Sequence, residues 1–222
     1  MITDGLNPLS FLTFVALVLG SGAAGLLLVF SLILRRPDAA RLIAKLALAG
    51  GGAYAGLFLL ASLRSKDRVL GLNEEKHICE VDCRLAYSVA GVKTPKTLDG
   101  RTARGTFYVV TVKVRFDEQT ISSHRGMGPL TPNSRYVAIV DGLGRRYEAP
   151  TEALQRELVP GESYTTDLVF DLPPDARDLR LILANHDIET PFLIGHENSF
   201  FHGKTTFRLE PAVRGSGDAA VS

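Results

Sequence analysis

The sequence predicts a membrane hairpin of two α-helices at residues 11–63, followed by an antiparallel β-sandwich of about seven strands at residues 77–211. Two long apolar runs separated by a short basic loop indicate the hairpin. Short segments in which apolar and polar residues alternate, with turn residues between them, indicate the sandwich. The length of 222 residues suits a hairpin plus one domain of ordinary size.

The first apolar run extends from Phe11 to Leu34 and carries no charged side chain. A helix needs about 20 apolar residues to cross the hydrocarbon core of a bilayer, so this run is long enough. A cleaved signal peptide would instead have basic residues before a short apolar core. The flank at residues 1–10 contains Asp4 and no basic residue, and the run ends at Arg35. We therefore expect an uncleaved membrane helix.

The second apolar run covers Leu46–Leu63 and reaches a spanning length if it begins at Leu42 and tolerates Lys45. The loop at residues 35–45 has four basic side chains and one acid, and such loops stay in the cytoplasm. The N-terminal flank and the domain after the second helix are then expected outside. Basic residues directly after the second run weaken this bias. The predicted protein spans the bacterial inner membrane twice and has a periplasmic domain.

Small residues recur four positions apart in both runs, at Ser21 and Gly25 and at Gly52 and Gly56. Such pairs let helix backbones approach closely. Either the two helices of the hairpin pack on each other there, which is the simpler expectation, or the pairs face another chain. Neither run contains an acid or a histidine, which argues against a proton or ion path.

The charged stretch at residues 64–76 is expected to be a linker, and residues 212–222 a disordered tail. The clearest strand between them is Thr106–Phe116. Its expected core face consists of Tyr108, Val110, Val112, Val114 and Phe116. The other expected strands are residues 79–89, 136–141, 145–148, 163–172, 179–184 and 205–209. Residues 151–157 fit one or two helical turns.

Both cysteines, Cys79 and Cys83, fall on the apolar face of the first expected strand. Four residues of straight strand span about 13 Å, whereas a disulfide needs Cα atoms within about 7 Å. A disulfide therefore requires a bulge or turn between the two residues, in which case an exported protein favours its formation. Without such a bend, both thiols are expected in the core.

A metal site is the alternative role for the cysteines, because thiolate and imidazole ligands suit copper and zinc. The candidate ligands are His77, Cys79, Cys83 and Met127, with one of His186, His196 or His202. Two helices before an exported β domain also resemble the layout of cytochrome oxidase subunit II, whose copper motif continues from two cysteines to a histidine and a methionine. Here Tyr87 and Ala90 stand at those last positions, so no cofactor is the main expectation.

The strand segments resemble the immunoglobulin-like domain of unknown function that is common in bacterial lipoproteins and exported proteins. The resemblance rests on four motifs: the long strand at residues 105–114, the Asp-Gly turn at 136–144, the Pro-Gly turn at 159–162 and the strand end at 168–173. The mycobacterial secreted immunoprotective antigen has a similar fold. The resemblance covers roughly residues 80–185 and implies a small exported β-sandwich without known catalysis.

Motifs for catalysis are absent from the sequence. Ser122 and Ser123, beside His124, lack a glycine-flanked nucleophile elbow, and no phosphate loop or dinucleotide fingerprint is present. The late-loop residues His196, Glu197 and His202 have the chemistry to bind metal or exchange protons, but local hydrogen bonds that hold the loop are the simpler expectation.

The expected function is therefore binding and not catalysis. A net charge of +1 gives no reason to expect nucleic acid as a partner. We expect a membrane-anchored module that binds or scaffolds an envelope protein through a sandwich face or the loops at residues 121–133 and 185–202. The alternative is a copper-handling or thiol-redox accessory protein that uses His77, Cys79 and Cys83.

Overall fold

The computed structural model of the chain describes residues 3–5, 8–79, 84–120, 128–132, 136–184 and 190–210. The chain divides into two compact units. The first contains residues 1–3, 68–186 and 205–222, and the second contains residues 4–67 and 187–204.

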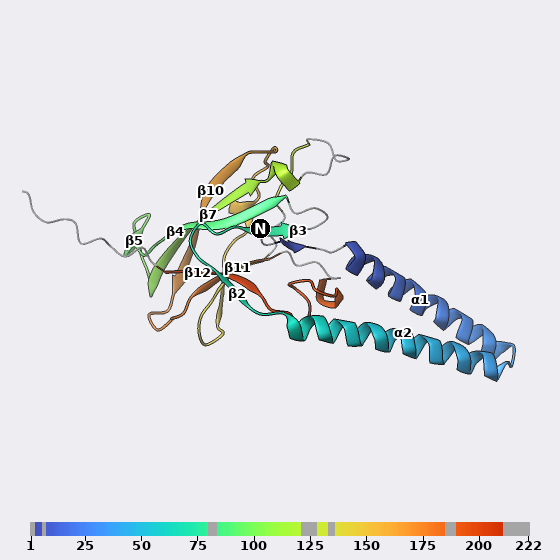
Figure 1. Cartoon of the computed structure of the whole chain (residues 1–222). Coiled ribbons are helices and arrows are strands. Elements are labelled where there is room, and N and C mark those ends of the chain that lie inside the picture. Colours follow the sequence, from blue (N-terminus) through green and yellow to red (C-terminus); the bar gives the residue numbers. More distant parts are fainter. Residues whose placement is uncertain are drawn as a thin grey trace, which may run out of the picture. The chain divides into compact units, whose positions relative to one another are not determined.

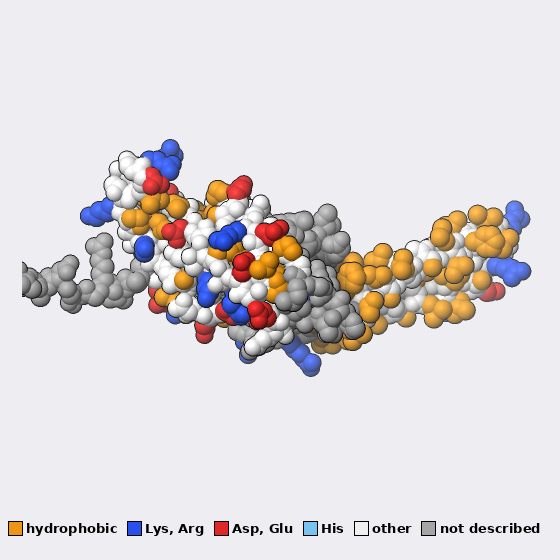
Figure 2. Space-filling model, turned by 90° about the horizontal axis from the view of Figure 1, so that it is seen from above, with side chains coloured by type: hydrophobic (Ala, Val, Ile, Leu, Met, Phe, Trp, Pro, Cys, Tyr) orange, Lys and Arg blue, Asp and Glu red, His pale blue; other side chains and the backbone are white. Residues whose placement is uncertain are grey.

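Two long helices form most of the second unit (Figure 1). Helix α1 covers Pro8–Ile33 and helix α2 covers Pro37–Arg64. Pro37 is the first residue of α2, where its fixed φ and missing N–H are tolerated. Both helices are long and apolar enough to span a membrane, which confirms this part of the prediction. Figure 2 shows hydrophobic side chains along the helices and charged ones at the end where the helices join.

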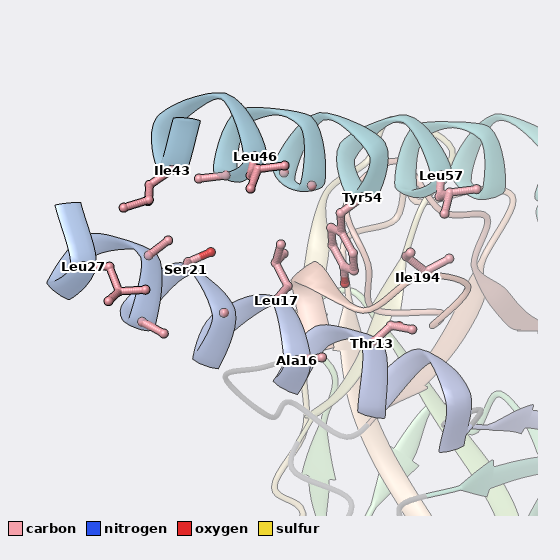
Figure 3. A pocket seen from close by; sticks show the side chains of 16 residues that line it. Thr13, Ala16, Leu17, Ser21, Leu27, Ile43, Leu46, Tyr54, Leu57 and Ile194 are labelled. Carbon is pink, nitrogen blue, oxygen red and sulfur yellow. The ribbon is translucent and has the colours of Figure 1, made fainter. Parts of the chain in front are cut away.

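The small residues of α1 and α2 do not bring the two backbones together. At Gly25, Gly52 and Gly56, no heavy atom in the described part of the chain, beyond the helix's own neighbouring residues, lies within 4 Å of where a Cβ atom would stand. Between the helices lies a largely apolar pocket of about 600 Å³, to which Ser21 and Tyr54 contribute (Figure 3). The helices contact each other, but the expected close approach at these glycines does not occur.

The first unit is a β domain. Its strands are β2 (Arg68–Leu70), β3 (Lys76–Cys79), β4 (Leu85–Lys93), β5 (Thr97–Leu98), β6 (Arg101–Thr102), β7 (Thr106–Phe116), β8 (Tyr136–Val140), β9 (Arg146–Glu148), β10 (Ser163–Leu172), β11 (Arg180–Ala184) and β12 (Thr205–Arg208). A short strand, β1 (Thr3–Gly5), falls at the division between the units. The 3₁₀ helices are η1 (Glu118–Thr120), η2 (Glu152–Leu154) and η3 (Thr190–Phe192).

Two sheets enclose the core of this domain. Strands β3-β4-β7-β10 follow one another in the first sheet, and the second has the order β2-β12-β11-β8-β9. The predicted core face of β7 is confirmed, since Val110, Val112, Val114 and Phe116 are fully buried. Apolar side chains from β8, β11 and β12 pack in the same core. The domain is thus sandwich-like, as the alternating segments predict.

Two features differ from the predicted antiparallel sandwich of about seven strands. The first unit has eleven strands within the described residues, and β2 pairs with β12 in parallel, with Leu70 opposite Phe207. Strand β2 lies in the stretch expected to be a linker, yet Leu70 is buried in the core. A strand of three residues is too short for alternation to reveal it.

The prediction of a single strand at residues 79–89 is wrong. The chain forms β3 and β4 instead, which pair in antiparallel fashion with Ile78 opposite Leu85. The first five residues of β4 are all buried, so the sequence alternation does not mark two different faces. The chain reverses direction after Cys79, and the distance argued from a straight strand does not apply. Cys83 and the side chain of Cys79 lie outside the described residues.

Candidate functional site

Charged side chains gather in a pocket of the first unit. The pocket has a volume of about 500 Å³ and is lined by Asn73, Glu74, Glu75, His77, Arg115, Asp117 and Gln119. We call four of these residues the acid–arginine cluster: Glu75, His77, Arg115 and Asp117. They come from the start of β3 and the end of β7, so the fold joins two separate parts of the sequence.

Strand register explains why these side chains meet. His77 on β3 lies opposite Ala86 on β4, and Ala86 lies opposite Arg115 on β7. The three residues therefore form a row across the first sheet, with the smallest side chain in the middle. Arg115 alternates with the buried Val114 and Phe116, which places its side chain on the sheet face away from the core.

Arg115 holds both acids of the cluster. Its Nε and Nη2 atoms donate to the two carboxylate oxygens of Glu75 at 2.9 and 2.7 Å, a bidentate geometry. Nη2 also donates to Asp117 Oδ2 at 3.2 Å, and the Gln119 backbone N–H donates to Asp117 Oδ1 at 3.0 Å. His77 is buried, with its Nε2 atom 3.8 Å from Glu75 Oε2.

These contacts keep the two acids ionised. Hydrogen bonds from Arg115 lower the pKa of Glu75 below its ordinary value. Burial raises the pKa of Asp117, but hydrogen bonds from Arg115 and Gln119 outweigh burial and leave it lowered. The same hydrogen bonds raise the pKa of Arg115. At neutral pH the cluster therefore holds two carboxylates and one guanidinium, all charged.

The predicted metal ligands are partly within the described residues. The ones outside are Cys83, Met127, His186 and the side chain of Cys79. Where the chain is described, no group of three or more His, Cys, Asp or Glu side chains is arranged to hold a metal. At the cluster, the guanidinium of Arg115 already neutralises the carboxylates beside His77 and repels a second cation. Copper or zinc binding through the cysteines stays a prediction.

The late-loop histidines belong to the second unit, and each makes a local hydrogen bond. His196 Nδ1 accepts from the N–H of Asn198 at 3.0 Å, and His202 Nδ1 lies 3.0 Å from the carbonyl oxygen of Gly203. The carbonyl of Glu197 accepts from Lys204 Nζ. The structure therefore shows these residues holding the shape of their own loop.

Lys76 is a buried polar residue that sequence reasoning missed. It is 1% exposed, and its Nζ atom donates to the carbonyl oxygens of Leu183 at 2.9 Å and Thr205 at 3.2 Å. It thereby links β3 in the first sheet to β11 and β12 in the second. In the sequence, Lys76 ends a charged stretch, so no pattern marks it as buried.

A second pocket of the first unit, of about 560 Å³, lies along β11 and β12. Its charged lining residues are Arg177, Asp178, Arg180, Arg208 and Glu210. Arg208 pairs with Glu210 at 3.3 Å, and Arg177 donates to carbonyl oxygens of its own turn. Because these charges satisfy one another at an exposed surface, the acid–arginine cluster is the stronger candidate site.

The fold and site define a sandwich-like β domain in a chain with two helices of membrane-spanning length. Comparison with known protein families gives no match, and no curated protein matches the sequence. Among solved structures, the chain is similar to the secreted protein MPT63 of Mycobacterium tuberculosis, with a TM-score of 0.42 and 14% identity over 64% of this chain and 97% of that one. It is also similar to the YjhA protein of Bacillus subtilis, with a TM-score of 0.37 and 14% identity over 63% of this chain and 98% of that one.

Proposed function

We propose that the chain is a membrane-anchored, extracytoplasmic, immunoglobulin-like β-sandwich that binds a basic segment of an envelope protein. The proposed binding site is the pocket that holds the acid–arginine cluster. The observation that supports this function is an excess of fixed carboxylates over cations among the side chains that line the pocket.

The charge of the pocket favours a basic partner. Glu74, Glu75 and Asp117 bring three negative charges and Arg115 brings one positive charge, which leaves two negative charges when His77 is not counted. A lysine or arginine side chain of a partner is attracted to such a site, and like charge excludes acidic segments. The contact is expected to weaken as salt increases.

Hydrogen bonds within the domain already hold the carboxylates in place. Arg115 fixes Glu75, and the backbone N–H of Gln119 fixes Asp117. Glu74 Oε2 accepts from the N–H of Gly71 at 2.7 Å. Since these side chains lose little rotamer freedom when a partner arrives, more of the interaction energy is available for binding.

The protonation of the cluster favours binding over catalysis. A general acid or base works best when its pKa lies near the operating pH, and enzymes raise the pKa of a carboxyl group to reach it. Here Arg115 lowers the pKa of both Glu75 and Asp117. Permanent charge suits an electrostatic contact with another protein.

The loop between the two helices supports an extracytoplasmic location for the β domain. Its basic residues are Arg35, Arg36, Arg41 and Lys45. All four are exposed, and Asp38 is the acid near them, with its Oδ1 atom 3.4 Å from Arg41 Nη1. A loop of this charge stays on the cytoplasmic side of an inner membrane, and two crossings then carry the domain across.

Site-specific photocrosslinking in native membranes tests the proposal. A photoreactive residue at Gln119, on the lining of the pocket, is expected to give one defined adduct with a protein whose crosslinked peptide is basic. The same residue at Leu143, which is 77% exposed in a turn of the same unit, is expected to give no such adduct.

Charge reversal supplies the matched comparison. Glu74→Lys is expected to abolish the Gln119 adduct, whereas Glu152→Lys, an equal change at the exposed η2, is expected to leave it intact. An adduct that survives Glu74→Lys, or one that forms equally from Leu143, would sink the proposal.

A further inference from the structure

A segment far from α2 in the sequence lies along the C-terminal part of that helix. The segment is Thr190–Lys204, and both belong to the second unit. Tyr54 Oη donates to the carbonyl oxygen of Phe192 at 2.7 Å. Two turns further along α2, Ser62 Oγ donates to the carbonyl oxygen of Phe200 at 3.1 Å. These bonds link the helix to backbone 138 positions later in the chain.

The end of the segment is fixed to the residues that follow α2. The N–H of Gly203 donates to Ser65 Oγ at 2.7 Å, and the N–H of Lys204 donates to Asp67 Oδ1 at 2.9 Å. Gly203 approaches the backbone of Lys66 and Asp67 so closely that a Cβ atom would collide with it. The segment is therefore held against the helix along its whole length and needs glycine at this contact.

The segment exposes three phenylalanine side chains. Phe192 and Phe200 are each 52% exposed and Phe201 is 80% exposed, whereas Leu193 is buried. The rings of Phe192 and Phe200 meet edge to face at 5.5 Å, and the rings of Phe200 and Phe201 lie 6.5 Å apart. Phe201 has φ of 61°, a conformation that bulky residues rarely adopt. An apolar aromatic group is thus held outward from an otherwise hydrogen-bonded loop.

The length of α2 places this aromatic group at a membrane surface. Its 28 residues extend about 42 Å, which exceeds the roughly 30 Å of a hydrocarbon core. If Arg41 marks one surface, about 20 residues of helix reach the other surface near Ala61. Ala61 is adjacent to Ser62, the residue that holds Phe200. Arg64 and Lys66 follow and are exposed, as suits the lipid phosphates.

We propose that Thr190–Lys204 is a second membrane anchor, which inserts Phe192, Phe200 and Phe201 into the lipid at the surface crossed by the end of α2. The occupant of this aromatic patch is the lipid bilayer, because the patch lies on the same helix that spans the bilayer and continues its apolar surface. The proposal is independent of the partner proposed for the β domain.

The absence of tryptophan from the sequence permits a direct test. Phe201→Trp in the full-length protein, reconstituted in phosphatidylcholine and phosphatidylglycerol bilayers, provides a single fluorescent reporter. Lipids brominated near the top of the acyl chains are expected to quench its emission strongly, and the emission is expected to lie at shorter wavelength than that of tryptophan in water. Phe192→Trp supplies a second, independent reporter.

Leu143→Trp, in an exposed turn of the first unit, is the matched control and is expected to emit at long wavelength without quenching. Reporters at Phe201 and Phe192 that no brominated lipid quenches would overturn the proposal. Blue-shifted emission without lipid quenching would also overturn it, because that result means that protein and not lipid covers the patch.

Discussion

The guanidinium of Arg115 and the carboxylate of Glu75 form a bidentate ion pair that bridges β7 and the start of β3, with N–O distances of 2.9 and 2.7 Å. Strand β4 lies between the two, so no backbone ladder joins them directly. The pair is about one-third exposed, which places its strength between that of a surface ion pair and that of a buried one.

Arg115→Met is expected to lower the free energy of unfolding by about 1–2 kcal/mol, because Glu75 and Asp117 lose their counter-ion. Denaturant unfolding of the full-length protein in micelles, followed by the circular dichroism of the β domain, measures the change. Arg101→Met, at an exposed position of β6, is the control and should cost little. Equal midpoints for the two variants would contradict a stabilising role for the ion pair.

The stability of the β domain is expected to fall in acid, and Arg115 is expected to set part of that fall. The pKa values of Glu75 and Asp117 are lowered from ordinary values of 4.5 and 3.8. Their contribution is therefore complete above the ordinary values and is lost as the pH falls through the folded-state values. Unfolding midpoints measured from neutral pH to about pH 3 should decline less steeply for Arg115→Met than for the unchanged protein.

Lys76→Met is expected to cost about 1–3 kcal/mol, because the buried carbonyls of Leu183 and Thr205 lose the donor that links the two sheets. Lys113→Met makes the same chemical change at a half-buried position of β7 and should cost less. Thermal unfolding of both variants decides the matter. A larger loss at Lys113 would mean that the link between the sheets contributes little.

Cys79 and Cys83 are expected to form a disulfide in the exported protein, because the reversal of the chain between β3 and β4 removes the separation that a straight strand would impose. Intact mass before and after reduction should differ by the two hydrogens gained by one disulfide. Two free thiols in the unreduced protein would refute the bond. Metal analysis against Cys79→Ser/Cys83→Ser separates that outcome from copper or zinc binding.

The basic loop is expected to fix the orientation of the hairpin. Alkaline phosphatase fused after Glu210 should be active and green fluorescent protein at the same position dark, since the fusion point is expected outside the cytoplasm. Replacing Arg35, Arg36 and Arg41 by glutamine should reduce phosphatase activity, because the basic residues after α2 then compete for the cytoplasm. Strong fluorescence from the unchanged hairpin would reverse the assigned orientation.

Long elements with a strong pattern could be predicted from the sequence. Strands β7 and β10 have the predicted bounds, Thr106–Phe116 and Ser163–Leu172, because each has one face in the core and one outside. The two apolar helices follow from length and composition. Burial on both sides hides the division between β3 and β4, and β2 is too short to show a period.

The candidate site was harder to predict, because its residues come together only through strand order. His77 stands beside Cys79 in the sequence, which pointed to metal chemistry, whereas its neighbour Glu75 pairs with Arg115, 40 positions later. Alternation along β7 does assign Arg115 to the polar face. Recognising the ion pair requires the register of β4, in which Ala86 lies between His77 and Arg115.

Strands β2 and β12 lie side by side, although Thr206 of β12 follows Arg68 of β2 by 138 positions. A ribosome makes β2 directly after the second helix and β12 near the end of translation. The second sheet therefore stays open while almost all of the domain is synthesised and exported, and contacts between such distant segments form slowly. A chain that stops before residue 205 should accordingly reach the membrane with its helices inserted and its β domain unfinished, a substrate for quality-control proteases.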